Sequence, residues 1–176
     1  MVNAFNCNIF DKGFGLTHSS LNHSRRQLFT RRNLSDKPSL PWIKESLFSD
    51  LCTQCGQCVK ACPTKIIQPS DGGFPRVDFQ QGECTFCYQC AEVCPEPLFN
   101  PKTQPAWQAK AHIEDSCLAK KNIDCRSCGD SCEPFAIQFK LAVGSVAQPH
   151  IQLPDCTGCG ACVSVCPTSA ITIKHT

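Results

Sequence analysis

The sequence lacks long hydrophobic runs. Within its 176 residues, no apolar stretch reaches the length that an α-helix needs to cross a bilayer, so a transmembrane helix is excluded. The hydrophobic fraction of 41% is raised by the cysteines, and the aliphatic core must therefore be small. A chain with so small a core needs cross-links or bound metal to stabilise its fold.

The sequence also lacks the residue combinations that carry out catalysis with side chains. Its 5 histidines are scattered along the chain, and none lies beside paired carboxylates or a nucleophile motif. Perturbed acids, bases and nucleophiles are the groups from which an active site is built. We therefore predict that the protein is not an enzyme and has no catalytic residues.

A complete export signal is missing as well. Arg25 and Arg26 form a twin arginine, but the residues that follow are polar, charged and interrupted by Pro38 and Pro41. A functional signal needs an apolar segment and a small-residue cleavage site at this place. The prediction is a cytoplasmic protein, whose thiols stay reduced and available to metal.

Cysteine is what the sequence has in abundance. There are 17 cysteines, close to a tenth of the residues, and all except Cys7 fall into groups that begin at Cys52, Cys84, Cys117 and Cys156. The groups at Cys52, Cys84 and Cys156 each read C-x2-C-x2-C-x3-C-P. This spacing is typical of bacterial ferredoxins that bind [4Fe-4S] clusters.

The spacing suits a cubane cluster for a geometric reason. Cysteines at every third position of a tight loop can each reach one iron, while the loop N–H groups stabilise the sulfides. The fourth cysteine faces away and ligates the cluster of a neighbouring group. Structural zinc usually takes two separated C-x2-C pairs, and disulfides join cysteines this close only with difficulty, so both alternatives are disfavoured.

The group at Cys117 departs from this pattern. Seven residues, LAKKNID, separate Cys117 from the intact run Cys125-x2-Cys128-x3-Cys132. Because all its cysteines remain, we interpret the group as a working motif with an insertion; the alternative is a decayed copy whose thiolates serve local folding. The regular groups thus predict three [4Fe-4S] clusters and the gapped group a fourth. The insertion is expected to be a surface loop that brings Lys120 and Lys121 close to that cluster.

Distance along the chain predicts how the groups pair. Short connections join the first group to the second and the third to the fourth, whereas Pro101 and Pro105 mark a linker between the two pairs. A nested pairing of the first group with the last is the alternative. We name the predicted ligand sets site 1 (Cys52, Cys55, Cys58, Cys94), site 2 (Cys84, Cys87, Cys90, Cys62), site 3 (Cys117, Cys125, Cys128, Cys166) and site 4 (Cys156, Cys159, Cys162, Cys132).

Short apolar runs flank the cysteine groups and predict the fold. They suggest a repeated unit of strand, cysteine loop, short helix and strand. The predicted class is α+β, with tandem bacterial ferredoxin-like 2[4Fe-4S] units: a basic, flexible tail over 1–44, a first unit over 45–104, and a second unit with the gapped motif over 105–176. The runs that precede a group are Leu47–Phe48, Val77–Phe79 and His150–Leu153; those that follow are Lys65–Ile67, Pro97–Phe99, Phe135–Phe139 and Ala170–Ile173.

Several segments together resemble the NapF-type ferredoxin of periplasmic nitrate reductase systems. They are SRRQLFTRR from Ser24, Pro41–Trp42, ECTFCYQCAEVCPEPLF from Glu83, Ala106–Trp107 and the gapped group, which ordinary ferredoxins lack. The resemblance implies a cytoplasmic iron–sulfur protein that binds the catalytic molybdenum subunit before its export and assists its maturation. The alternative is a general electron-transfer ferredoxin that passes single electrons to a redox partner.

The charges are unevenly distributed. Residues 21–44 carry six Lys or Arg and one acid, whereas residues 45–176 carry ten Lys or Arg and thirteen acids, a net charge of −3. A basic segment ahead of an acidic domain could dock a client protein, and the alternative is a solvated tail. Because the cysteine-rich part is acidic, we do not predict binding to nucleic acid.

Overall fold

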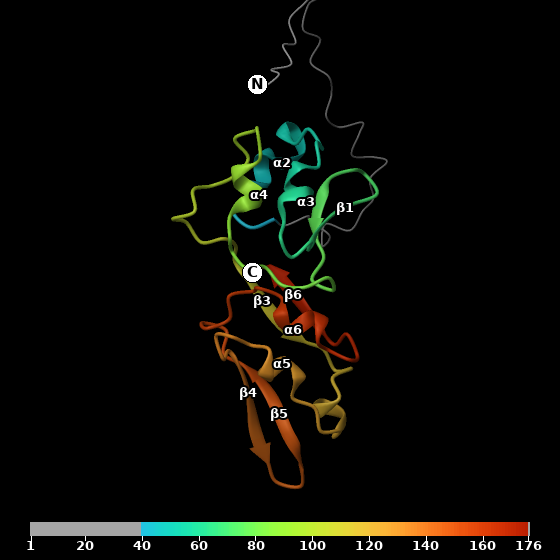
Figure 1. The fold of residues 1–176 in the computed structure, drawn as a ribbon. Coiled ribbons are helices and arrows are strands. Elements are labelled where there is room, and N and C mark those ends of the chain that lie inside the picture. The colour runs from blue at the N-terminus through green and yellow to red at the C-terminus, as the bar shows by residue number, and fades with distance from the viewer. Residues whose placement is uncertain (1–39, 176) are drawn as a thin grey trace, which may run out of the picture. The chain divides into compact units, whose positions relative to one another are not determined.

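The computed structural model describes residues 40–175, which belong to one compact unit, Lys37–Thr176. Cys7, the twin arginine and the remainder of the basic segment up to residue 39 lie outside the described residues. Within residues 40–175, no helix is long and apolar enough to cross a membrane. Figure 1 shows the order of the elements along this unit.

The first half contains three helices and one hairpin. Strands β1 and β2 run antiparallel, with Ile67 opposite Val77. Ile43 and Phe99 form an isolated antiparallel bridge that joins the start of this half to its end. The elements are α2 (Glu45–Leu51), α3 (Gln57–Ala61), β1 (Ile67–Pro69), β2 (Pro75–Val77) and α4 (Gln89–Glu92).

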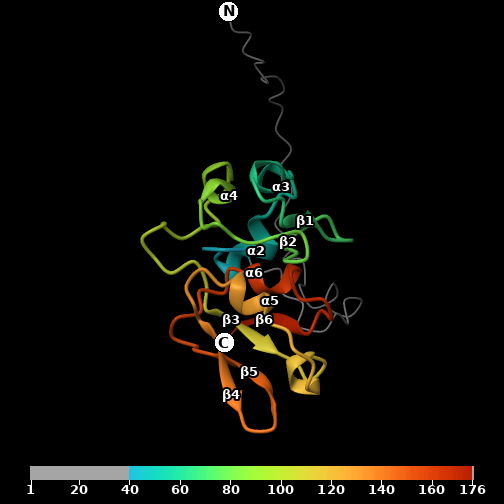
Figure 2. The ribbon, with the colours of Figure 1, turned by 60° about the horizontal axis from the view of Figure 1, so that its bottom comes forward.

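The second half contains two antiparallel pairs of strands. Strand β3 pairs with β6, and β4 pairs with β5 (Figure 2). Three short helical turns lie between these strands. The elements are β3 (Ala109–Ile113), η1 (Ala119–Lys121), α5 (Ser127–Asp130), β4 (Ile137–Ala142), β5 (Ser145–Ile151), α6 (Ala161–Ser164) and β6 (Ile171–His175).

A short helix lies between the second and fourth cysteines of every group, whereas the predicted order of strand, cysteine loop, short helix and strand placed the helix after the cysteines. These helices are α3, α4, α5 and α6, and none is longer than five residues. In the regular groups, a proline follows the fourth cysteine directly. Proline has no N–H to donate and does not continue a helix, which is consistent with the short length.

The predicted strands were correct after three of the four groups. Strands β1, β4 and β6 begin within the apolar runs that follow the first, third and fourth groups. After the second group, Phe99 makes only its single bridge. The strand expected at Leu47–Phe48 is wrong, because these residues lie in α2, where Phe48 is buried and Leu47 exposed. Glu45 in the first turn of α2 favours a helix through the helix dipole.

Each half has its own small core. The first consists of Leu40, Phe48, Ile66, Ile67 and Cys90, and the second is built around β3, β6, Ile137 and Val163. Leu40 is 1% exposed and Trp42 is 5% exposed, so the packed part of the chain already includes residues that we had assigned to the tail.

Candidate metal centres

Each of the predicted cysteine sets lines a cavity of its own in the described part of the chain. Every cavity takes three cysteines from one group and the fourth cysteine from its neighbour. Among residues 40–175, none of these cavities joins the first group to the last, so the nested pairing is not observed. The structure therefore brings together sites 1, 2, 3 and 4 as the sequence predicted them.

The regular groups share one backbone turn. Directly after the second cysteine, the chain adopts a left-handed conformation at Gly56 (φ 71°), Tyr88 (φ 76°) and Gly160 (φ 85°). Tyr88 adopts this conformation although it has a side chain. Its ring makes an edge-to-face contact with Trp42, with the ring centroids 5.0 Å apart, and its hydroxyl donates a hydrogen bond to the Asn100 carbonyl at 2.7 Å. Such a turn wraps the loop around the cavity at each of these sites.

The gapped group reaches its cavity along a different path. Arg126, the residue after its second cysteine, has φ −131°, and the left-handed residue is Asn122 (φ 64°), which ends η1. The insertion lies at the surface, as predicted, with residues Lys120 to Asp124 exposed, but it also packs against a neighbouring strand. The Asn122 side chain accepts a hydrogen bond from the Val146 amide at 3.0 Å, and the Gln148 side chain donates one to the Ala119 carbonyl at 2.8 Å. The insertion is therefore fixed against β5.

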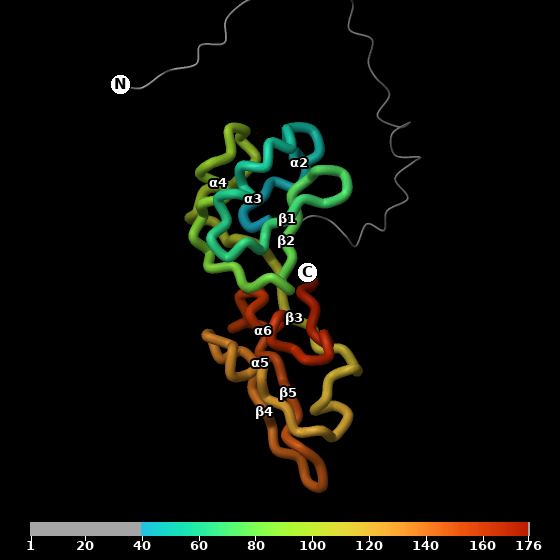
Figure 3. The backbone as a smooth tube through the Cα atoms, turned by 45° about the vertical axis from the view of Figure 1, so that its right-hand side comes forward, coloured from blue at the N-terminus to red at the C-terminus, as the bar shows by residue number. Residues whose placement is uncertain are grey.

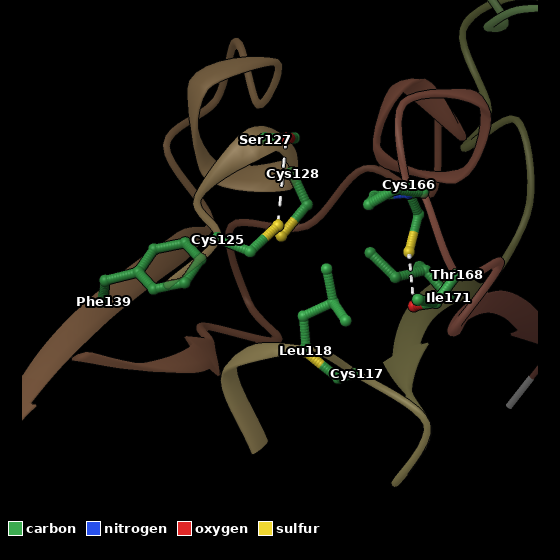
Figure 4. Close-up of a pocket in the computed structure, with 10 residues that line it drawn as sticks. Cys117, Leu118, Cys125, Ser127, Cys128, Phe139, Cys166, Thr168 and Ile171 are labelled. Atoms are coloured by element: carbon green, nitrogen blue, oxygen red, sulfur yellow. Dashed lines mark hydrogen bonds between the residues drawn. The ribbon is translucent and has the colours of Figure 1, made fainter. Parts of the chain in front are cut away.

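Figure 4 shows Cys117 at the same cavity as Cys125, Cys128 and Cys166, with Leu118 beside it. The displaced cysteine thus lies where the first ligand of site 3 is needed. Lys120 and Lys121, which we expected to bring positive charge close to this site, do not line the cavity. The ammonium of Lys120 donates to the Ile113 carbonyl at 2.9 Å and forms an ion pair with Asp115 at 3.0 Å.

The third cysteine of every group sits in the least polar surroundings. Burial, together with the smaller effect of neighbouring cysteines of the same cavity, raises the pKa of Cys58 and Cys128 to about 11 and that of Cys90 and Cys162 to about 12. Without metal, these thiols hold their protons at neutral pH. A metal that binds them must release those protons and supply the positive charge that stabilises the thiolates.

Hydrogen bonds to sulfur occur at several of the cysteines. The amide of Ala170 donates to Sγ of Cys166 at 3.2 Å, and the amide of Ala111 donates to Sγ of Cys156 at 3.5 Å. At Cys62, burial raises the pKa, but hydrogen bonds from the Thr64 hydroxyl and nearby backbone amides outweigh it, and the net pKa is lowered. Donors of this kind stabilise ligating sulfur and also affect the reduction potential of iron–sulfur clusters.

The donor sets fit a cluster better than a single ion. The cysteines in residues 40–175 are free, so no disulfide joins the members of any of the four sets. In the same residues, no three His, Cys, Asp or Glu side chains are arranged to hold one metal ion. Four thiolates spread around one cavity are the donor set of a [4Fe-4S] cluster, which presents four separate irons.

The two halves meet between site 2 and site 4. The amide of Cys84 donates a hydrogen bond to the carbonyl of Cys159 at 2.8 Å, and the rings of Phe79 and Trp107 form an edge-to-face contact with their centroids 5.9 Å apart. Phe79 packs against the cores of both halves. Figures 1 and 3 agree that α6 and β3 lie between the first half and the hairpin of β4 and β5.

Strand β3 belongs to the site but was not predicted from the sequence. Its residues Lys110 and Ala111 both contact Cys156 of site 4. A signal was present, because Ala109–Ile113 alternates small or apolar residues with polar ones, which is typical of a half-buried strand. No cysteine group begins directly after it, and so it did not fit the repeat that we used.

Comparisons with known families and proteins agree with this geometry. Residues 51–98 and residues 122–170 each match the family described as the 4Fe-4S dicluster domain. The second match begins after Cys117, so it leaves the displaced cysteine outside.

Curated relatives extend the similarity to most of the chain. The ferredoxin-type protein NapF of Haemophilus influenzae is 46% identical over 166 residues, covering 94% of this chain and 91% of that protein. Its counterpart in Escherichia coli K12 is 44% identical over 155 residues, covering 86% of this chain and 94% of that protein. A ferredoxin of Methanothermococcus thermolithotrophicus is 43% identical over 63 residues, 35% of this chain and 90% of that protein.

Proposed function

The chain belongs to the NapF family of ferredoxin-type proteins, and from this premise we propose that it binds four [4Fe-4S] clusters and assists the maturation of a periplasmic nitrate reductase. It contains two tandem 4Fe-4S ferredoxin domains with short helices and small strands. The proposed client is the catalytic molybdenum subunit, bound before its export. The proposed role is that of a binding and assembly protein without catalytic side chains.

One observation supports the proposed number of four clusters. Each of the four cavities is lined by four cysteines, three from one group and one from the adjacent group. This arrangement is the one expected when the fourth cysteine of a motif ligates the partner cluster. All the cysteines of sites 1 to 4 are accounted for in this way, including Cys117.

Two observations support the proposed partner and location: the uneven distribution of charge along the chain and its membership of the NapF family. Residues 21–44 have an excess of basic residues, while residues 45–176 carry a net charge of −3. A segment and a domain of opposite charge can contact different parts of one client and orient it. We propose that this happens in the cytoplasm, where the thiols stay reduced and the client still carries its export signal.

A general electron-transfer role is the second candidate, and one contact favours it. The hydrogen bond from the Cys84 amide to the Cys159 carbonyl joins a cysteine of site 2 directly to a cysteine of site 4 at 2.8 Å. A pure assembly protein has no need for its two halves to be joined through cysteines of two sites, whereas an electron carrier does.

Capture of the client tests the maturation proposal. The full chain, purified anaerobically with its clusters, should retain the signal-bearing precursor of the catalytic subunit and release the mature subunit. Cells without the chain should export a reductase with little activity. Fully active reductase from such cells, together with reduction of a soluble acceptor by the purified chain, would instead establish the electron-transfer role.

A further inference from the structure

A lysine side chain is fixed against the loop of site 4. The ammonium of Lys110, on β3, donates a hydrogen bond to the carbonyl of Cys156 at 2.5 Å, and the lysine is half-buried. Cys156 and Cys162 of the same site are buried. A charge in such surroundings is screened by water less than a charge on the surface.

Other contacts hold β3 against this loop. The Ala111 amide donates to Sγ of Cys156 at 3.5 Å, and the Trp107 indole donates to the Thr157 carbonyl at 3.1 Å. Gly158 lies so close to the Ala109 carbonyl that a side chain there would overlap it. Lys110 is therefore held in place by its own strand rather than by a flexible loop.

The positive charge of Lys110 is not neutralised by an acid. Within residues 40–175, Lys110 forms no ion pair, even with Asp155 next to Cys156. Its cross-strand neighbour Lys174 forms an ion pair with Glu114 at 3.0 Å. The charge that acts on the Cys156 loop is therefore that of Lys110.

We infer that Lys110 raises the reduction potential of the cluster bound at site 4. A reduced cluster carries one more negative charge than the oxidised cluster, and a nearby fixed positive charge stabilises the reduced form. The Ala111 amide acts in the same direction, because hydrogen bonds to ligating sulfur also raise the potential. The inference rests on the proposed assignment of Cys132, Cys156, Cys159 and Cys162 to one cluster.

Site 2 offers an internal comparison. The ammonium of Lys102 donates to the carbonyl of Cys87, but at 3.3 Å and from an exposed position. Its effect on site 2 should therefore be smaller than that of Lys110 on site 4. In the described part of the chain, sites 1 and 3 have no lysine hydrogen-bonded to the carbonyl of a ligand cysteine.

The test is a redox titration of the fully loaded, anaerobic full-length protein, followed by electron paramagnetic resonance. The Lys110→Gln and Lys110→Met variants should shift one centre to a more negative potential and leave the others in place. Lys110→Arg should restore the wild-type value, because it keeps the charge. The matched control is Lys174→Gln on the neighbouring strand, which should change no centre. The shifted signal is assigned to site 4 if Cys132→Ser alters the same signal.

Other outcomes would refute the inference. Unchanged potentials in Lys110→Gln and Lys110→Met at full iron content would show that the lysine does not tune the site. Loss of one cluster's iron from both variants, with retention in Lys110→Arg, would show that Lys110 holds the loop closed instead. If Cys132→Ser leaves the iron content of the protein unchanged, the ligand assignment itself fails, and the inference fails with it.

Discussion

The ring of Phe79 lies against the backbone of Gly160, so close that a β carbon on this glycine would overlap the ring. Phe79 belongs to the first half of the protein, and Gly160 belongs to the loop of site 4. The glycine thus serves two purposes, since its φ of 85° is also one that other residues rarely adopt. The junction between the halves depends on the absence of a side chain at this position.

Gly160→Ala should therefore destabilise the protein more than Gly56→Ala. Both alanines would adopt a left-handed conformation at a cost of about 1–2 kcal/mol. Only the alanine at 160 would also collide with Phe79, because a β carbon at Gly56 meets nothing within 4 Å. The measurement is the rate at which the cluster absorbance disappears on anaerobic incubation with an iron chelator, which should be fastest for Gly160→Ala.

A double variant separates the collision from the backbone strain. Removal of the ring in Phe79→Ala should relieve part of the defect of Gly160→Ala and none of the defect of Gly56→Ala. Equal rates of cluster loss for the two single glycine variants would show that the Phe79 contact contributes nothing to stability.

Cys117 should be a ligand, and iron analysis can decide this. Anaerobically purified wild-type protein should contain about 16 iron and about 16 acid-labile sulfide per chain, whereas a decayed third group predicts about 12 of each. Cys117→Ser should lose one cluster's iron or leave a three-iron centre, because a hydroxyl is a poor substitute for a thiolate. Cys7→Ser is the control and should keep the full iron content, since Cys7 belongs to no group.

The basic segment should contribute to client binding through its charge. A variant in which Arg25, Arg26, Arg31 and Arg32 are replaced by glutamine should retain less of the precursor, and raised salt should weaken the wild-type complex in the same way. These substitutions spare Leu40 and Trp42, which are buried in the packed part of the chain. Equal capture by the variant and the wild type at low salt would remove the segment from the binding mechanism.

The proposed location can be tested with a fusion. Residues 1–50 joined to a reporter that works only after export should give no signal, because no apolar segment follows Arg25 and Arg26. A matched fusion with an apolar segment and a small-residue cleavage site inserted after Phe29 should be exported and active. Activity of the unmodified fusion would place the protein outside the cytoplasm and remove the basis for reduced thiols.

Much of the cysteine architecture was predictable because it depends on local spacing. The run of cysteines determines where α3, α4 and α6 can form, and the isoleucines at 67, 137 and 171 start the strands that follow. The cysteine sets of the four cavities were predictable for the same reason. In each set, three cysteines are close in sequence. The fourth was predictable because the last cysteine of this motif ligates the other cluster of a pair.

Other features depend on contacts between distant segments, which spacing does not reveal. Strand β3 is stabilised by β6, some sixty residues later, where Ala111 lies opposite Ile173. The direction of the Lys120 side chain depends on Asp115 and on the carbonyl of Ile113. Leu40 and Trp42 appeared to belong to a polar tail, because the segments that bury them come from elsewhere in the first half.

The exchange of fourth cysteines between adjacent groups has a consequence for the order of assembly during synthesis. In the proposed ligand sets, Cys94 is the last ligand of site 1 to be synthesised, and Cys90 is the last of site 2. Neither set is therefore complete until almost all of the first half has been made. Every ligand of these two sites precedes Cys117 in the chain. The first half can therefore acquire its clusters while the ribosome is still translating the second.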